Sequence, residues 1–157
     1  QQYPAGPSET VFDLGKLSPS TLVDKGRSGE TVKISVGRQQ MLIMEVLWSR
    51  GEATAKEITE GVTEMIPTTL STVQTLLRKL ITKGAVAHEQ RGRTFWFKPA
   101  VDRSAVERSA SQELVERVFG GSVKGLVAHL LSEEAVSAEE LAEIKAMIEQ
   151  KEREVKP

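Results

Sequence analysis

Between residues 36 and 82 the apolar residues recur at helical spacing in three segments that turn-forming residues separate. The first segment is GRQQMLIMEVLWSRG, and Gly51 ends it. Its inward stripe consists of Met41, Ile43, Met44, Leu47 and Trp48. We expect Trp48 to anchor a core rather than to form a binding platform.

The next two helices have recognisable starts. Thr54 and Glu57 have the spacing of a capping box, which opens a short helix that turns Ile58 and Val62 inward. Pro67 then breaks the chain, and Thr69 is an N-cap residue type for a third helix over about 70–82. That helix has an apolar stripe at i, i+3, i+4 and i+7, made of Val73, Leu76, Leu77 and Leu80.

A β-hairpin follows the third helix. Two strand-like runs, 85–89 and 94–98, flank the sequence Gln-Arg-Gly-Arg at 90–93, and the second run is the aromatic TFWFK. Three helices followed by a hairpin with a basic tip are the order of a winged helix-turn-helix. The predicted fold class is therefore mainly α, a winged helix-turn-helix followed by a C-terminal helical dimerisation arm.

The arm is predicted to contain three amphipathic helices. The first runs from about 103 to 118, the second follows Gly120-Gly121 with Ser122 as its cap, and the third opens at the capping box Ser137–Glu140. Such short helices cover one another poorly, so a second copy of the chain is the economical way to bury them. The predicted dimer interface consists of Val106, Leu114, Val115, Val118, Val123, Leu126, Val127, Leu130, Leu131, Leu141, Ile144 and Ile148.

Composition and charge divide the chain into three parts. Residues 1–35 are rich in Pro, Gly, Ser and Thr, and we expect a flexible N-terminal extension with at most a short ordered piece near 32–35. Residues 36–100 form the winged helix, and residues 101–157 form the arm. Residues 65–100 carry six basic side chains against Glu89 alone, whereas residues 101–157 carry eight basic and twelve acidic side chains. This asymmetry indicates a basic working surface in the middle of the chain.

Several classes of chemistry lack the residues they need. The chain has no cysteine and two histidines, His88 and His129, so we predict no metal site, no cofactor and no enzyme activity. We expect His88 to be structural, whereas a pH-sensing role stays open for His129 because it lies near the predicted dimer helix. No apolar run approaches the roughly 18 residues of a membrane span. We therefore expect no membrane partner and a cytoplasmic location.

DNA recognition needs cations for phosphates and short polar groups for base edges, and the middle of the chain supplies both. Ser and Thr donate and accept hydrogen bonds, a Thr methyl packs on thymine, and Gln pairs with adenine. The arginines suit phosphates. The predicted DNA-binding residues are Thr69, Ser71, Thr72, Gln74, Thr75, Arg78, Arg91 and Arg93.

In four segments the chain resembles the penicillinase-repressor (BlaI/MecI/CopY) family of bacterial winged-helix repressors. These segments are LIMEVLWSRGEATAKEI, STVQTLLRKLITKGAV, HEQRGRTFWFKP, and FGGSVKGLVAHLL followed by VSAEELAEI. The resemblance covers about residues 36–152. It implies a homodimer that binds an inverted-repeat DNA operator and blocks transcription, with Ser71, Thr72, Gln74 and Thr75 at the bases and the helices of 103–152 at the dimer interface.

The resemblance also implies two kinds of release from DNA, and this chain departs from both. Some members are inactivated by a protease, through a membrane β-lactam sensor, at an Asn-Phe bond in the first C-terminal helix. Alignment on Val118-Phe119 places Glu113-Leu114 at that bond, which argues against a regulatory protease of the same kind. Copper-responsive members use a C-terminal cysteine cluster, and this chain has no cysteine.

Two other functions stay open at the level of sequence. A winged helix also serves as a protein-interaction module without specific DNA binding, because a fold alone does not decide function. A regulator that senses a ligand at the dimer junction is the other alternative, although no residue names the ligand.

Overall fold

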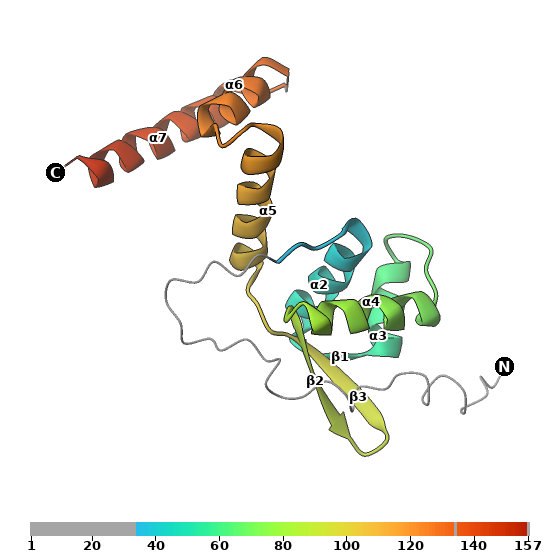
Figure 1. Ribbon diagram of the computed structural model, residues 1–157. Helices are drawn as coiled ribbons and strands as arrows, with labels where there is room; N and C mark the ends of the chain where they lie inside the picture. Colours follow the sequence, from blue (N-terminus) through green and yellow to red (C-terminus); the bar gives the residue numbers. More distant parts are fainter. Residues whose placement is uncertain (1–33, 134, 157) are drawn as a thin grey trace. The chain divides into compact units, whose positions relative to one another are not determined.

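The computed structural model describes residues 34–133 and 135–156, and the chain divides into two compact units, Gln1–Gln112 and Glu113–Pro157. Among the described residues, the N-terminal unit contains α2, α3, α4, the first part of α5 and a small sheet (Figure 1). Its helices are α2 (Arg38–Arg50), α3 (Ala55–Thr63) and α4 (Leu70–Thr82), and its strands are β1 (Ala53–Thr54), β2 (Val86–Arg91) and β3 (Thr94–Pro99). These elements confirm the predicted winged-helix fold.

The helices begin and end at the residues whose chemistry predicts it. The backbone N–H of Glu57 donates to Thr54 Oγ1 at 3.2 Å, and the N–H of Thr54 donates to Glu57 Oε2 at 3.0 Å, which confirms the capping box of α3. Gly51 ends α2 at φ +83°, a conformation that favours glycine, and its N–H donates to the Leu47 carbonyl. Thr69 caps α4 as predicted.

The core of this unit is aliphatic, with one aromatic ring at its centre. Its largest fully buried side chains come from all three helices and from β3, and they are Ile43, Met44, Leu47, Ile58, Val73, Leu77, Leu80 and Phe97. Trp48, Met41 and Leu76 are half-buried and pack against this cluster. The side chains predicted to face inward therefore do so, and Trp48 lies against the core.

The sheet has three antiparallel strands in the order β1-β3-β2. The hairpin of β2 and β3 is the predicted one, extended slightly, whereas the two-residue strand β1 was not predicted. Ala53 of β1 pairs with Phe97 and faces the core, while Thr54 pairs with Trp96 on the other face. Because β1 pairs with only two residues of β3, the outer part of the hairpin has two strands.

The helix α5 (Arg103–Val118) begins as part of the N-terminal unit. Trp48 Nε1 donates to the Val101 carbonyl at 3.0 Å, and Arg103 lies 4.7 Å from the centroid of the Trp48 ring while it pairs with Glu45. Val106 is 3% exposed within the core. The division between the two compact units falls inside α5, after Gln112. Val106 is removed from the predicted dimer interface, because its side chain is already buried within one copy.

Residues 34–36, named here the N-terminal strap, connect α4 with α5. The N–H of Ile34 donates to the buried Ser109 Oγ at 2.8 Å, and Lys83 Nζ donates to the Ser35 carbonyl at 2.6 Å. Lys83 Nζ also donates to Oε1 of the buried Gln40, at 3.0 Å. Ile34, 2% exposed, belongs to the core, so the ordered piece expected near 32–35 includes it. The rest of the predicted extension lies outside the described residues.

The C-terminal unit contains the end of α5, α6 (Val123–Glu133) and α7 (Ala138–Val155). Ser122 Oγ accepts the N–H of Gly125, and Ser137 Oγ accepts the N–H of Glu140, so both predicted caps are present. Among the described residues of α6 and α7, none is buried. None of the described helices is both long and apolar enough to cross a membrane.

A first prediction concerns the close contact between α2 and α3. A Cβ on Gly61 would lie 3.0 Å from Val46 Cγ2 and 3.2 Å from Cγ1. Alanine raises helix propensity by up to about 1 kcal/mol, but overpacking against a stiff β-branched side chain costs about 1–3 kcal/mol. We expect Gly61→Ala to lower the free energy of unfolding, measured by urea denaturation.

The background Val46→Ala supplies the control for that prediction. In that background the valine methyl groups are gone, and Gly61→Ala should leave the free energy of unfolding unchanged or raise it. The double-mutant cycle should therefore show that the two substitutions together cost less than the sum of their separate effects. A Gly61→Ala protein that is more stable than the parent would contradict the prediction.

A second prediction concerns the N-terminal strap. Ser109→Ala removes the acceptor of the Ile34 N–H in a buried site, which should cost about 1–3 kcal/mol of unfolding free energy. Ser111→Ala is the matched control, since the exposed Ser111 hydroxyl bonds only to the Glu107 carbonyl of its own helix. Equal stabilities of the two variants in thermal or urea unfolding would refute the role of Ser109.

Candidate nucleic-acid interface

The polar face of α4 is fixed by the apolar face opposite it. Val73, Leu77 and Leu80 have no exposed surface, so the rotation of α4 about its axis is set by the core. The structure consequently brings most of the predicted base-reading residues to one exposed side of the helix. Ser71, Thr72, Thr75 and Arg78 are exposed there, and Gln74 is half-buried.

The polar residues of this face were all predicted to bind DNA, but they differ in their hydrogen bonds within the protein. Thr69 Oγ1 accepts the N–H of Thr72 at 3.2 Å and donates to Thr72 Oγ1 at 3.0 Å. Thr75 Oγ1 donates to the Ser71 carbonyl at 3.1 Å. Within the described part of the chain, the side chains of Ser71 and Gln74 have no hydrogen-bond partner. Thr69 therefore acts as a cap, whereas Ser71 and Gln74 have polar groups available for an external ligand.

The tip of the hairpin is a tight two-residue loop. Arg91 pairs with Thr94, so Gly92 and Arg93 form the whole connection. Gly92 has φ +64°, whereas Arg93 does not have a positive φ. A glycine with positive φ at the first loop position alone is typical of a type II′ turn. The exposed side chain of Arg93 thus lies at the outermost point of the hairpin.

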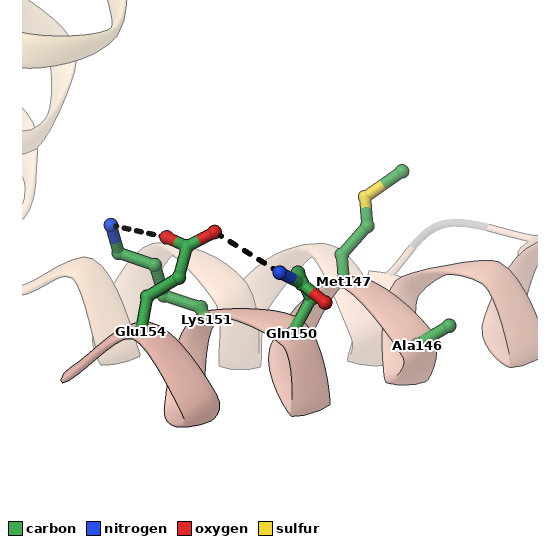
Figure 2. A pocket seen from close by; sticks show the side chains of 5 residues that line it. All are labelled: Ala146, Met147, Gln150, Lys151 and Glu154. Carbon is green, nitrogen blue, oxygen red and sulfur yellow. Dashed lines mark hydrogen bonds and ion pairs between the residues drawn. The ribbon is translucent and has the colours of Figure 1, made fainter. Parts of the chain in front are cut away.

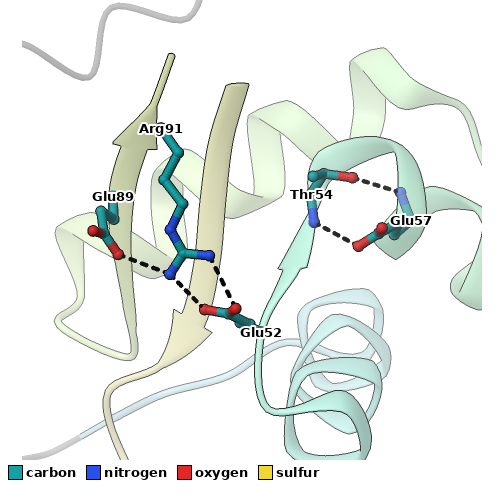
Figure 3. Close-up of polar contacts among 5 residues, drawn as sticks. All are labelled: Glu52, Thr54, Glu57, Glu89 and Arg91. Atoms are coloured by element: carbon teal, nitrogen blue, oxygen red, sulfur yellow. Dashed lines mark hydrogen bonds and ion pairs between the residues drawn. The ribbon is translucent and has the colours of Figure 1, made fainter. Parts of the chain in front are cut away.

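Arg91 does not lie at the tip as a separate cation. Its two terminal nitrogens bind both carboxylate oxygens of Glu52, at 3.0 and 2.9 Å, and one of them also binds Glu89 at 3.0 Å (Figure 3). These hydrogen bonds raise the pKa of the Arg91 guanidinium and lower that of the Glu52 carboxyl. The prediction that Arg91 serves phosphates assumed an unpaired charge, and the structure corrects that assumption.

Glu52 and Trp96 are the residues of this cluster that sequence reasoning missed. Glu52 is separated from Arg91 by 39 positions, and no local pattern reports a pairing over that distance. Trp96, half-buried on β3, has its ring 5.2 Å from the guanidinium carbon of Arg91. The aromatic run TFWFK marked a strand, but it could not show which ring would lie under a cation.

The two histidines lie in different settings. His88 on β2 is half-buried beside Phe95, and burial lowers its pKa. His129 on α6 is exposed, with its ring 6.1 Å from that of Phe119. In the residues that the structure describes, no three His, Asp or Glu side chains group as metal ligands would. Neither histidine therefore belongs to a cluster that could hold a metal there.

The residues predicted to form a dimer interface lie mainly on the surface of the C-terminal unit. Val115, Leu126 and Ile144 are half-buried. The exposed ones are Leu114, Val118, Val123, Val127, Leu130, Leu131, Leu141 and Ile148. Each has more than a third of its surface exposed, which is unusual for so many large apolar side chains in one small unit.

A shallow hollow on α7 is not a ligand-binding site by itself. It is lined by Ala146, Met147, Gln150, Lys151 and Glu154, and Glu154 pairs with both Lys151 and Gln150 (Figure 2). One helix supplies all five side chains, so the hollow cannot enclose a ligand within this helix. It is part of the uncovered surface of the unit.

A winged helix with a polar face on its third helix and a cation at the hairpin tip is typical of DNA-binding regulators of transcription. Residues 36–150 match the sequence model of the family described as "Penicillinase repressor". The chain therefore belongs to the penicillinase-repressor family, and its function is that of a DNA-binding transcriptional repressor.

The chain is similar to several individual proteins. The penicillinase repressor of Bacillus licheniformis is 27% identical over 111 residues, which cover 71% of this chain and 87% of the relative. The methicillin resistance regulatory protein MecI of Staphylococcus aureus is 23% identical over 109 residues, which cover 69% and 89%. The solution structure of the B. licheniformis BlaI monomeric form in complex with the blaP half-operator is similar with a TM-score of 0.42 and 27% identity, covering 46% of this chain and 89% of that one.

Proposed function

We propose that this repressor reads its operator through the N-terminal half of α4 and binds an inverted repeat as a homodimer. The observation that carries the proposal is the exposed polar face of α4, on which Ser71 and Gln74 have no partner among the described residues. Groups of this kind make hydrogen bonds to base edges in the major groove. No observation favours the alternative of a protein-interaction module.

The residues of α4 take different parts in this proposal. Gln74 has the amide geometry for a paired contact with adenine, and Ser71 donates to or accepts from either base of a pair. The Thr75 hydroxyl hydrogen is used within the helix, so Thr75 offers chiefly its methyl group, which suits thymine. Arg78, on the same face, and Arg93 at the hairpin tip supply cations for phosphates.

The dimer follows from the uncovered apolar surface of the C-terminal unit. Isolated helices as short as α6, 11 residues, are marginal in water, and most of their stability comes from packing of an apolar face. On α7, Leu141, Ile144, Ile148 and Val155 recur at spacings of three, four and seven, as in a helix that packs along another helix. A second copy of the chain would cover these stripes and place two DNA-binding units on one operator.

The proposal assigns the protein no catalytic activity, in keeping with a family of repressors. It also assigns the protein to the cytoplasm, the compartment that holds bacterial DNA. Proteolytic inactivation is left out of the proposal, because Glu113-Leu114 takes the place of the Asn-Phe bond at which some members of the family are cleaved.

A third prediction tests the reading of bases. Gln74→Ala combined with Thr75→Ala should erode the preference for an operator over random duplex, by about 1–3 kcal/mol for each lost contact. The measurement is fluorescence anisotropy with DNA chosen by selection from a random library. Thr82→Ala, which removes a hydroxyl at the other end of α4, is the control and should leave the preference unchanged. A parent protein that selects no sequence would refute the proposed function.

A fourth prediction tests the dimer. Leu130→Glu with Leu131→Glu should convert the protein to a monomer in analytical ultracentrifugation, since charges would replace apolar side chains at the interface. Binding to a full inverted repeat should weaken, whereas binding to a half-site should not change. Ser132→Glu is the control for the added charge on the same helix. A parent protein that sediments as a monomer at micromolar concentration would contradict this part of the proposal.

A further inference from the structure

The outer part of the hairpin needs support that its backbone does not provide. The strand β1 pairs with β3 only at Trp96 and Phe97, so from Phe95 outward β2 and β3 have no third strand. A two-stranded hairpin is marginally stable in water and twists freely. The direction in which Arg93 points therefore depends on side-chain contacts between the hairpin and the rest of the unit.

The side chain of Arg91 makes such a contact across the whole width of the sheet. It starts on β2 and reaches Glu52 beside β1 (Figure 3). On the way its guanidinium lies over the Trp96 ring of the central strand β3. Glu89, two residues earlier on β2, binds the same guanidinium. One arginine thus connects β2 and β3 with the residue that directly precedes β1.

The geometry sets this cluster apart from an ordinary surface ion pair. A single exposed pair contributes little, because solvent screens it and two long side chains must be ordered. Here the Arg91 guanidinium has three partners, namely the bidentate carboxylate of Glu52, the carboxylate of Glu89 and the face of Trp96. A planar guanidinium also loses less conformational entropy for each hydrogen bond formed than a lysine side chain does. Arg91, Glu52 and Glu89 sum to −1, and the nearby Lys98 brings the local charge to zero, so the cluster offers a phosphate no net positive charge.

We propose that Arg91 is a positioning residue, which fixes the direction of the hairpin so that Arg93 meets the DNA backbone, and that Arg91 makes no phosphate contact itself. This inference rests on the proposed binding of DNA. Glu52 is part of the same device, although it carries the charge that DNA repels.

The direction in which Glu52→Gln changes DNA affinity distinguishes a positioning role of Arg91 from a direct contact between Arg91 and a phosphate. If Arg91 bound a phosphate, Glu52 would compete with the DNA, and Glu52→Gln would strengthen binding. If Arg91 positions the hairpin, Glu52→Gln weakens binding despite removing a negative charge. Glu64→Gln, at the end of α3, removes one charge outside the cluster and is the matched control.

The experiment measures operator affinity by fluorescence anisotropy over a range of salt concentrations. We expect Glu52→Gln and Arg91→Lys each to weaken binding by about fivefold with an unchanged salt slope. Arg93→Gln should reduce the magnitude of the slope of log K against log salt concentration by about 0.9, the value for one phosphate contact. The exchange Glu52→Arg with Arg91→Glu should restore affinity, since it rebuilds the pair with its charges reversed. Tighter binding by Glu52→Gln, full affinity of Arg91→Lys, or a lower slope for Arg91→Gln would overturn the inference.

A second measurement needs no DNA. Backbone ¹⁵N order parameters of Gly92 and Arg93 should fall in Glu52→Gln and stay unchanged in Glu64→Gln. Unchanged order in Glu52→Gln would overturn the inference by itself. If the parent protein selects no DNA sequence, the proposed function fails, and this measurement still decides whether Arg91 and Glu52 hold the hairpin.

Discussion

Burial of the apolar side of α4 is the constraint on which the rest of this molecule depends. Val73, Leu77 and Leu80 are fully enclosed, so the helix has one permitted rotation about its axis, and its polar residues are on the surface as a consequence. The two ends of the helix are held as well, by the Thr69 cap and by Lys83, which reaches the Ser35 carbonyl. The polar side chains that we propose to read DNA are thus presented by a helix whose rotation is fixed.

The hairpin is also held in one direction, but chiefly by ion pairs and a cation–π contact rather than by burial of apolar side chains. The inward face of the sheet, with Ala53 and Phe97, belongs to the core, whereas the outward face has Trp96 and the ion pairs of Arg91. Rigid presentation of a few contact groups lowers the ordering cost of binding. The N-terminal unit therefore orients α4 through a buried apolar stripe, and we propose that an exposed charged cluster orients the hairpin.

Local patterns predicted the helices, caps and hairpin of this chain well, because each depends on residues close together in sequence. The capping box of Thr54 and Glu57 and the bounds of α4 are examples. What the sequence could not show were contacts between distant positions, such as Glu52 with Arg91 or Ile34 with Ser109. For this reason Arg91 was treated as an unpaired cation, and Val106 was assigned to a dimer interface when it belongs to the core. The polar face of α4 was predictable residue by residue, but the use of the Thr69 and Thr75 hydroxyls within the helix was not.

The N-terminal strap has a practical consequence for handling the protein. Its two neighbouring peptide groups are bonded to Lys83, the residue directly after α4, on one side and to Ser109 of α5 on the other. A purification tag, a fluorescent label or a surface linkage placed just before Ile34 would therefore pull on both helices at once.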